Sequence, residues 1–367
     1  MKKIAIIFTM MLFVFGEELQ VIESLKAPYQ LGDDAITTFK GLKTPKSIIL
    51  IIADGTGIGQ YTLSYYANNN FAPSRFDHVG LVVTHPDDGL KKVTDSASSG
   101  TAMATGAKTY NGAISVDKEG NAIKTAMEIA KEFNYSTGVI ATSTVTHATP
   151  ASFIAHIDSR SKEGEIARQM ARSNTDLIFG GGEKYWTDDV ISILNEHNGQ
   201  LIREIDAPYD PSKRVVGLFD HGALNPHTEK RNPTTTQMAK RALDIFDRKA
   251  KGFFLMIEES QIDWGGHSNN ADYIRGEMES LNDLVNMCLN YQEKHKDVLV
   301  VLTSDHECGG VSIHDAENGN LDVRYTSDYH SANFVPIFAT GPGAEFFDAM
   351  IDNTTIGKQL IKYIKND

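Results

Sequence analysis

Four short apolar runs, each followed by polar or acidic residues, most constrain the fold of this chain. They occupy residues 46–52, 137–143, 253–257 and 298–303. Runs of this length that are rich in Ile, Leu and Val are typical of strands buried on both faces of a sheet. Stretches with helical periodicity separate them, at residues 124–133, 234–250 and 277–295. Strands that alternate with helices predict an α/β fold of three layers, with a doubly wound, mostly parallel central sheet and helices on both faces.

Composition limits the size of the fold and the class of partner. The chain has 367 residues, of which 41% are hydrophobic, and a formal net charge of −13. We expect one domain over residues 17–367, with a surface insertion at about 187–224, where Pro208, Pro211 and mixed charges interrupt any regular pattern. The charge and the lack of a Lys/Arg cluster argue against nucleic-acid binding. An anionic substrate would also be repelled at long range, so cations at the site must attract it.

The N-terminus and the two cysteines bear on location. Residues 1–16 combine Lys2 and Lys3 with an apolar run at 4–15 and then Gly16. This pattern predicts a signal peptide and therefore a periplasmic or secreted protein, since the run is too short for an ordinary transmembrane helix. An uncleaved anchor is the lesser alternative, and we expect no stable membrane partner. Whether Cys288 and Cys308 form a disulfide stays open at this stage.

Oxygen-bearing side chains follow the buried strands. Asp54, Glu258 and Asp305 each stand at the end of an apolar run, and Thr149 follows another. Open α/β sheets bind ligands at the carboxyl ends of their strands. One such residue alone would most simply be a helix cap or a solvated carboxylate, but four of them predict a shared site.

Histidines accompany these carboxylates. Asp263 and His267 are four residues apart, a spacing that points both side chains the same way on a helix. His306 directly follows Asp305, and His330 stands just before the last predicted strand. Aspartate and histidine together are typical zinc ligands, whereas carboxylate and hydroxyl oxygens suit magnesium.

A run of small residues at 93–111, VTDSASSGTAMATGAKTYN, contains a candidate nucleophile. A helix is predicted to begin at Ser96, which would place its hydroxyl at a helix N-terminus, where backbone N–H groups favour an anion. Serine is a weak nucleophile unless a base or a metal activates it. A flexible linker is the alternative interpretation of such a composition.

Taken in order, these motifs resemble the alkaline phosphatase family across residues 46–341. The residues that carry the resemblance are Asp54-Gly55, Thr94-Asp95-Ser96-Ala97, Thr149-Pro150, Arg160, Glu258, Asp263, His267, Asp305-His306-Glu307 and His330. The resemblance implies a metal-dependent enzyme that hydrolyses small phosphate monoesters at alkaline pH through a phosphoserine. It also implies two Zn²⁺ and one Mg²⁺ per chain, and since the family is often dimeric it leaves a homodimer as an open alternative.

The resemblance further implies a role for each residue. Ser96 would be the phosphorylated nucleophile and Arg160 the bidentate clamp on phosphate. One zinc would take Asp263, His267 and His330, and the other would take Asp54, Asp305 and His306. Magnesium would take Asp54, Thr149 and Glu258, and Asp95 would support the substrate site.

Three further positions near these motifs are occupied by His147, Trp264 and Cys308. His147 and Trp264 stand where other members of the family carry Asp and Lys, so we expect weaker magnesium binding at the third site and looser retention of phosphate. Cys308 is close in sequence to the ligands of the second zinc, and we expect it to pack as a small apolar side chain.

Other functions are less consistent with the motifs. A sulfatase of the same wider fold would need Cys or Ser followed by x-Pro-x-Arg, whereas Ser96 is followed by Ala-Ser-Ser-Gly. A phosphodiesterase would usually carry a Thr nucleophile and lack the Arg clamp. An inactive phosphate- or zinc-binding protein would be expected to have lost Ser96 or a ligand, and none is missing.

Overall fold

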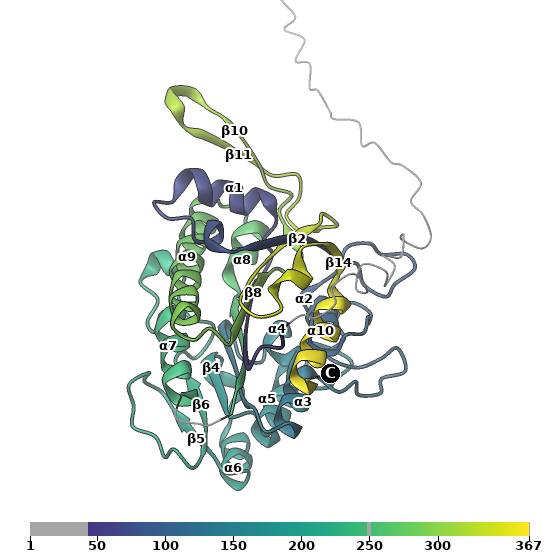
Figure 1. The fold of residues 1–367 in the computed structure, drawn as a ribbon, viewed down its shortest axis with the longest axis vertical. Helices are drawn as coiled ribbons and strands as arrows, with labels where there is room; N and C mark the ends of the chain where they lie inside the picture. The colour runs from purple at the N-terminus through teal and green to yellow at the C-terminus, as the bar shows by residue number, and fades with distance from the viewer. Residues whose placement is uncertain (1–42, 248–250, 367) are drawn as a thin grey trace, which may run out of the picture. The chain divides into compact units, whose positions relative to one another are not determined.

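A ten-stranded sheet forms the centre of the molecule in a computed structural model that describes residues 43–247 and 251–366. The strand order across the described sheet is β14-β2-β13-β8-β1-β7-β3-β4-β6-β5. Figure 1 labels β14, β2, β8, β4, β6 and β5 of this sheet. In that order the strands are Met350–Asp352, His78–Val83, Val335–Thr340, Val298–Thr303, Ser47–Ala53, Phe253–Glu259, Ser136–Thr144, Leu177–Gly181, Arg214–Leu218 and Gly199–Ile202.

Strand direction agrees with the predicted fold class. β1 runs parallel to both β7 and β8, and β3 runs parallel to β7 and β4. Only β13, among the described strands of this sheet, runs antiparallel to its neighbours, β2 and β8. The mostly parallel, doubly wound α/β sheet is therefore confirmed.

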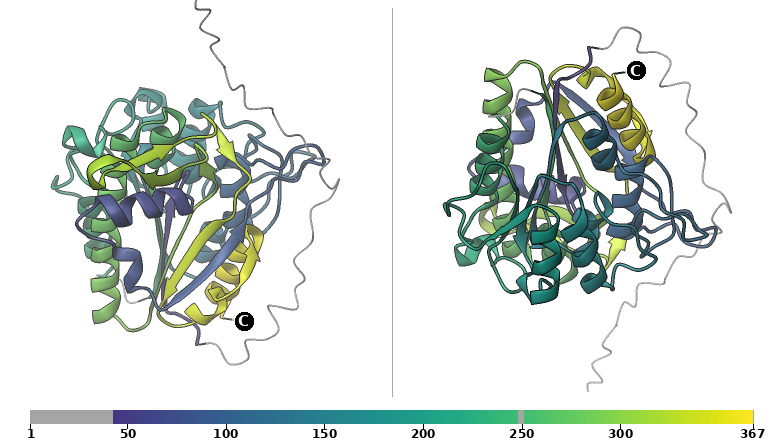
Figure 2. Two further views of the ribbon diagram at one scale, coloured as in Figure 1. Left: turned by 90° about the horizontal axis from the view of Figure 1, so that it is seen from above. Right: turned by 90° about the horizontal axis from the view of Figure 1, so that it is seen from below.

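Helices cover both faces of the sheet because the central strands are apolar on both. In β1, Ile48, Leu50 and Ile52 face one hydrophobic cluster, and Ile49 and Ile51 face the other. The first cluster packs against α2 (Ser96–Thr105), α3 (Ala126–Glu132), α5 (Glu163–Arg172), α6 (Asp188–Glu196) and α10 (Asn353–Lys365). The second packs against α1 (Ile58–Ala67), α7 (Thr235–Phe246) and α9 (Ala271–Lys294). Figure 2 shows these two helical layers with the sheet between them.

The predicted surface insertion at 187–224 is wrong. This stretch supplies α6 and the strands β5 and β6, which pair in parallel with each other, while β6 also pairs with β4. These strands have only 4 and 5 residues and lie at one edge of the sheet. Strands this short offer too few residues for a distinct apolar run, which is why the sequence pattern did not reveal them.

Smaller elements complete the fold near the strand ends. The helices α4 (Ala148–Ser152) and α8 (Gln261–His267) follow β3 and β7, and β9 (Glu307–Cys308) pairs with β12 (His330–Ser331). A hairpin of β10 (Ser312–Asp315) and β11 (Leu321–Arg324) projects beside α1 (Figure 1). In the described part of the chain, no helix has the length and apolar character needed to cross a membrane. The predicted signal peptide, residues 1–16, lies outside the described residues, and Cys288 and Cys308 are both free and buried.

Candidate active site

Three carboxylates meet at one edge of the sheet because of the parallel strand register. Ile52 of β1 is aligned with Glu258 of β7 and with Thr303 of β8, so Asp54 and Asp305 emerge beside Glu258. All three carboxylate side chains are fully buried. Gly55 turns the chain after β1 with a φ of +69°, and a Cβ there would lie 2.6 Å from the Cα of Asp263. The turn therefore requires glycine and brings Asp263 close to Asp54.

Asp54, Asp305 and His306 form one compact group of possible metal donors. The Nε2 atom of His306 lies 3.2 Å from Oδ2 of Asp305 and 3.6 Å from Oδ1 of Asp54. The backbone N–H groups of Gly55 and His306 donate to Oδ1 of Asp305 at 3.1 and 2.9 Å. These bonds orient the Asp305 carboxylate and leave Oδ2 facing the group.

Asp263, His267 and His330 form a second group. Helix α8 places His267 one turn after Asp263, with its Nε2 3.4 Å from Oδ2 of Asp263, and Nε2 of His330 lies 3.5 Å from Oδ1 of the same carboxylate. The Nδ1 atoms of the two histidines bond to backbone carbonyls, at 2.8 Å to Asp328 and at 2.9 Å to Thr94. Each Nδ1 therefore donates to its carbonyl, which directs the two Nε2 atoms, 3.1 Å apart, toward the Asp263 carboxylate as possible metal donors.

A third group combines Asp54, Glu258 and His147, with Thr149 on the adjacent helix α4. The hydroxyl of Ser260 donates to Oε2 of Glu258 at 2.6 Å, which fixes that carboxylate in place. The sequence did not indicate this support from Ser260.

Several donor atoms in these groups are buried without a hydrogen-bond partner among the described residues. They are both carboxylate oxygens of Asp54, Oγ1 of Thr149, Oε1 of Glu258, Oδ1 of Asp263 and Oδ2 of Asp305. Buried polar atoms are almost always paired, so such a concentration marks a site for cations. Carboxylate oxygens with imidazole nitrogens are a donor set that suits divalent metals.

The pKa values of these buried groups also indicate a site that binds positive charge. Burial, together with the charge of Asp305, raises the pKa of Asp54 well above its ordinary value. Burial likewise raises the pKa of Asp305 to about 6 and that of Glu258 to about 7. The hydrogen bond to Asp263 raises the pKa of His267 to about 9, which means that a proton is held where the two side chains converge. A divalent cation would remove each of these penalties.

Ser96 lies beside the Asp54 group at the start of α2. Its Oγ is 3.2 Å from Nε2 of His306 and the residue is 2% exposed. The predicted helix start is confirmed, because α2 begins at Ser96 and Asp95 caps it by accepting a hydrogen bond from the Ser98 N–H. The Ser96 hydroxyl therefore faces both the buried donors and the N-terminal N–H groups of the helix.

Arg160 connects Asp95 with His147 across the site. Its Nη1 donates to Oδ2 of Asp95 at 3.1 Å, and its Nη2 lies 3.0 Å from Nε2 of His147. Burial and the Arg160 charge lower the pKa of His147 to about 4, so the ring is neutral and its Nε2 accepts a hydrogen bond from Arg160 Nη2. Trp264 packs edge to face against His147, with ring centroids 6.3 Å apart.

The structure places two residues at the site where the sequence did not lead us to expect them. Cys308 lies with Asp263, His267 and His330, not with the Asp54 group to which it is close in sequence. Tyr329 stacks on His330 with ring centroids 4.4 Å apart while remaining 50% exposed. The only sequence signal for either was its position next to a candidate ligand motif.

Known proteins resemble this chain over most of its length. The family model described as alkaline phosphatase matches residues 45–201 and 196–321. Alkaline phosphatase 3 of Bacillus subtilis is 38% identical, with 87% of this chain and 89% of that protein covered. The structure of alkaline phosphatase from the Antarctic bacterium TAB5 aligns with a TM-score of 0.83 at 35% identity, covering 88% of this chain and 99% of the other. A cold-active alkaline phosphatase from Shewanella aligns with a TM-score of 0.80 at 28% identity, covering 87% and 99%. The chain therefore belongs to the alkaline phosphatase family and is a phosphatase of that family.

Proposed function

We propose that this enzyme hydrolyses phosphate monoesters at alkaline pH through a phosphorylated Ser96. The observation that carries the proposal is the position of the Ser96 Oγ, 3.2 Å from His306 Nε2, at a helix N-terminus and beside buried donors that lack partners among the described residues. A phosphoryl group at this point would meet backbone N–H donors on one side and cation sites on the other.

The metals proposed for the site are two Zn²⁺ and one Mg²⁺ per chain. Asp263, His267 and His330 would hold one zinc, and Asp54, Asp305 and His306 the other, because both sets combine carboxylate oxygen with imidazole nitrogen. The magnesium ligands would be Asp54, Glu258 and Thr149, whose free atoms are all oxygens. When bound, such ions lower the pKa of nearby hydroxyl groups and water and neutralise developing negative charge.

In the proposed reaction, Ser96 is the nucleophile and Arg160 binds the phosphate. The Oγ of Ser96 loses its proton and attacks phosphorus, and the bond from phosphorus to the alcohol oxygen breaks as the new bond forms. The departing oxygen takes up a proton from solvent and leaves as the alcohol. Water next attacks the phosphoserine, which releases inorganic phosphate and restores the Ser96 hydroxyl. Arg160 would turn its two terminal nitrogens to the phosphate oxygens, while Asp95 keeps the guanidinium aimed at the site.

His147 and Trp264 are proposed to tune the third metal site and the retention of phosphate. A neutral His147 brings no negative charge to magnesium, so this ion should bind weakly. Structures of TAB5 alkaline phosphatase in which a histidine is replaced by Glu or Asp carry Mg in a site named M3, which supports the proposal. Trp264 has no charge to offer the phosphate anion, which would then leave more readily.

A labelling experiment on the nucleophile tests this function. Incubation with radiolabelled inorganic phosphate at acid pH should label Ser96, and Ser96→Ala should abolish the label and most of the hydrolysis. Assays with a chromogenic phosphate monoester, a diester and a sulfate ester separate the phosphatase from a diesterase or a sulfatase. An active but unlabelled protein would contradict the mechanism, and an inactive, zinc-loaded protein would favour a binding role.

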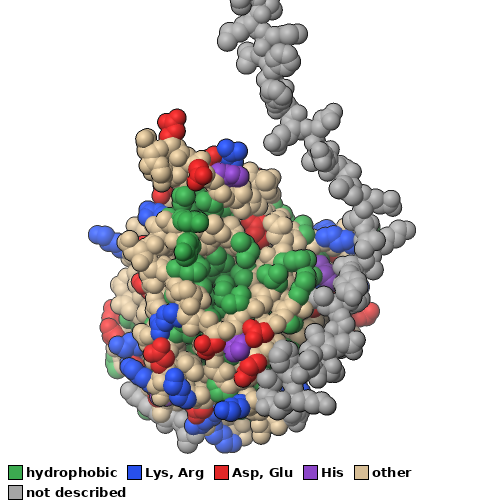
Figure 3. Space-filling model, turned by 45° about the horizontal axis from the view of Figure 1, so that its top comes forward, with side chains coloured by type: hydrophobic (Ala, Val, Ile, Leu, Met, Phe, Trp, Pro, Cys, Tyr) green, Lys and Arg blue, Asp and Glu red, His purple; other side chains and the backbone are tan. Residues whose placement is uncertain are grey.

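Export and a homodimer remain predictions. Residues 1–16 are the basis for a periplasmic or secreted enzyme, and N-terminal sequencing of the mature protein tests their removal. For a homodimer, the most suitable described surface is a groove whose lining includes the exposed side chains of Ile58, Tyr65, Tyr66 and Val79. Figure 3 shows hydrophobic side chains gathered on one face of the molecule. Sedimentation of Tyr65→Ser beside the unchanged protein tests that assembly.

A further inference from the structure

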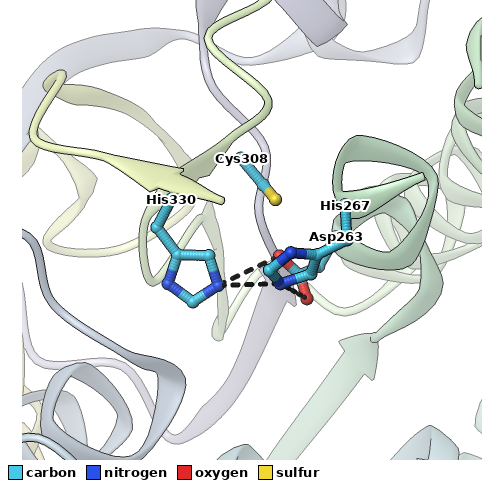
Figure 4. Close-up of side chains that lie close together, drawn as sticks. All are labelled: Asp263, His267, Cys308 and His330. Carbon is cyan, nitrogen blue, oxygen red and sulfur yellow. Dashed lines mark hydrogen bonds and ion pairs between the residues drawn. The ribbon is translucent and has the colours of Figure 1, made fainter. Parts of the chain in front are cut away.

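The thiol of Cys308 points into the group formed by Asp263, His267 and His330. The four possible donor atoms of these side chains all lie within 4.8 Å of one another. Figure 4 shows the Cys308 sulfur directed toward the space between the His330 ring and the Asp263–His267 pair. The residue is fully buried, so the thiol does not face solvent.

The backbone holds Cys308 firmly in this position. Cys308 on β9 is aligned with His330 on β12, and directly opposed residues of an antiparallel pair project their side chains from the same face. Its N–H donates to the carbonyl of Gly55 at 3.0 Å, and its own carbonyl accepts from Nε2 of Gln60 at 2.6 Å. The direction of the thiol is therefore set by the same short ladder that positions a proposed zinc ligand.

Space for the sulfur depends on Gly266, the residue before His267. A Cβ at position 266 would lie 2.8 Å from the Cβ and 2.9 Å from the Sγ of Cys308. Any side chain there would push the thiol away from its present position. The absence of a side chain on Gly266 thus lets Cys308 approach the group.

A second observation points to a ligand at this place. Oδ1 of Asp263 is buried and has no hydrogen-bond partner in the described part of the chain, and Asp263 is only 4% exposed. Its two carboxylate oxygens face His330 and His267 respectively, and both of those rings direct Nε2 inward. A buried carboxylate with one oxygen that lacks a hydrogen bond, grouped with two imidazoles and a thiol, is the environment of a metal ion.

We propose that the Cys308 thiolate is a fourth protein ligand of the metal ion held by Asp263, His267 and His330. The inference rests on the proposed function, which places a zinc at this group. Binding of the dication releases the thiol proton to solvent, so that one sulfur–hydrogen bond is exchanged for one sulfur–metal bond. Asp263 and Cys308 then contribute two negative charges, which balance the charge of the dication.

Thiolate ligands favour soft metals, so the site should prefer zinc and cadmium over magnesium and manganese more strongly than one built from Asp and two His alone. Cys308 would thus set which metal the site accepts.

Cadmium binding followed by absorption spectroscopy tests the inference directly, because a bond from thiolate sulfur to cadmium gives a charge-transfer band in the ultraviolet. The metal-stripped, full-length protein is titrated with Cd²⁺ while the band and the bound metal are measured. We expect a band that saturates at one Cd²⁺ per chain. The chain has only one other cysteine, Cys288, which is buried in α9, so Cys288→Ser is the matched control and should keep the band.

Cys308→Ser should lose the band, still bind the metal, and show at least a tenfold weaker cadmium affinity. The presence or absence of the band in the wild-type protein tests the inference even if a variant fails to fold. A wild-type protein that binds one Cd²⁺ per chain without the band, yet hydrolyses monoesters when loaded with zinc, would overturn the role of Cys308 alone. A protein that binds no zinc and hydrolyses nothing would instead overturn the proposed function together with this inference. A band that survives in Cys308→Ser but disappears in Cys288→Ser would show that Cys288 binds the cadmium, and would likewise overturn the role of Cys308.

Discussion

Asp305 is a buried carboxylate whose ionisation costs folding energy unless a cation is near. Burial is the main reason that its pKa rises from 3.8 to about 6. At 1.36 kcal/mol per pKa unit, the charged side chain destabilises the chelator-treated protein by ~3 kcal/mol at neutral pH. Asp305→Asn removes that charge, and its Oδ1 still accepts the two backbone hydrogen bonds from Gly55 and His306.

The substitution is therefore expected to act in opposite directions with and without metal. For a chain of 367 residues, ~3 kcal/mol corresponds to a rise in melting temperature of ~4 °C in the chelator-treated protein. With zinc and magnesium added, Asn is a poorer ligand, and each tenfold loss of affinity removes ~1.4 kcal/mol of the stabilisation by bound metal. Asp305→Asn should thus raise the melting temperature after chelation and reduce the increase that metals produce.

Differential scanning calorimetry from pH 3 to pH 8, with chelator or with metals, measures both effects. Because the folded-state pKa is raised, the penalty is absent below pH 3.8, grows as pH rises and is complete above about pH 6. The gain in Asp305→Asn should follow that course. Asp315→Asn, at an exposed carboxylate of β10, is the matched control and should change neither measurement. A lower melting temperature for chelated Asp305→Asn at pH 8, or a gain that persists at pH 3, would refute the electrostatic reasoning.

Further predictions concern the metals, the two unusual positions, the arginine and a buried ion network. Chelation should abolish hydrolysis and zinc with magnesium should restore it; activity in a zinc-free protein would contradict the metal assignment. Trp264→Lys combined with His147→Asp should tighten phosphate inhibition and magnesium binding and slow turnover at alkaline pH, whereas unchanged inhibition and metal dependence would exclude a tuning role. Arg160→Lys should lower kcat/KM by ~10-fold or more, because one ammonium cannot replace a bidentate guanidinium, and steady-state kinetics at several phosphate concentrations measures it. Arg231→Met should destabilise the fold by ~3–5 kcal/mol, since it leaves two fully buried glutamates without their countercharge, and a denaturant titration that finds no loss would disprove this.

Local sequence patterns were sufficient to predict much of the architecture. The long apolar runs became β1, β3, β7 and β8, because a strand buried on both faces must be apolar throughout. The grouping of Asp54, Glu258 and Asp305 followed from strand order, since parallel strands deliver their carboxyl ends to one edge. The spacing of Asp263 and His267 similarly predicted their contact on one turn of helix.

What the sequence determined by itself was local: where strands and helices begin, which side chains share a helix face, and which polar residues stand at strand ends. Tertiary structure decided the antiparallel direction of β13, the addition of β5 and β6 to the sheet edge, and the group that Cys308 joins. Hydrophobic periodicity repeats within a few residues, so it reports the environment of one element but not its partner. Cys308 is two residues from His306 in sequence, yet its pairing with His330 turns the thiol toward Asp263. That outcome depends on a backbone ladder between segments 22 residues apart, which no local pattern encodes.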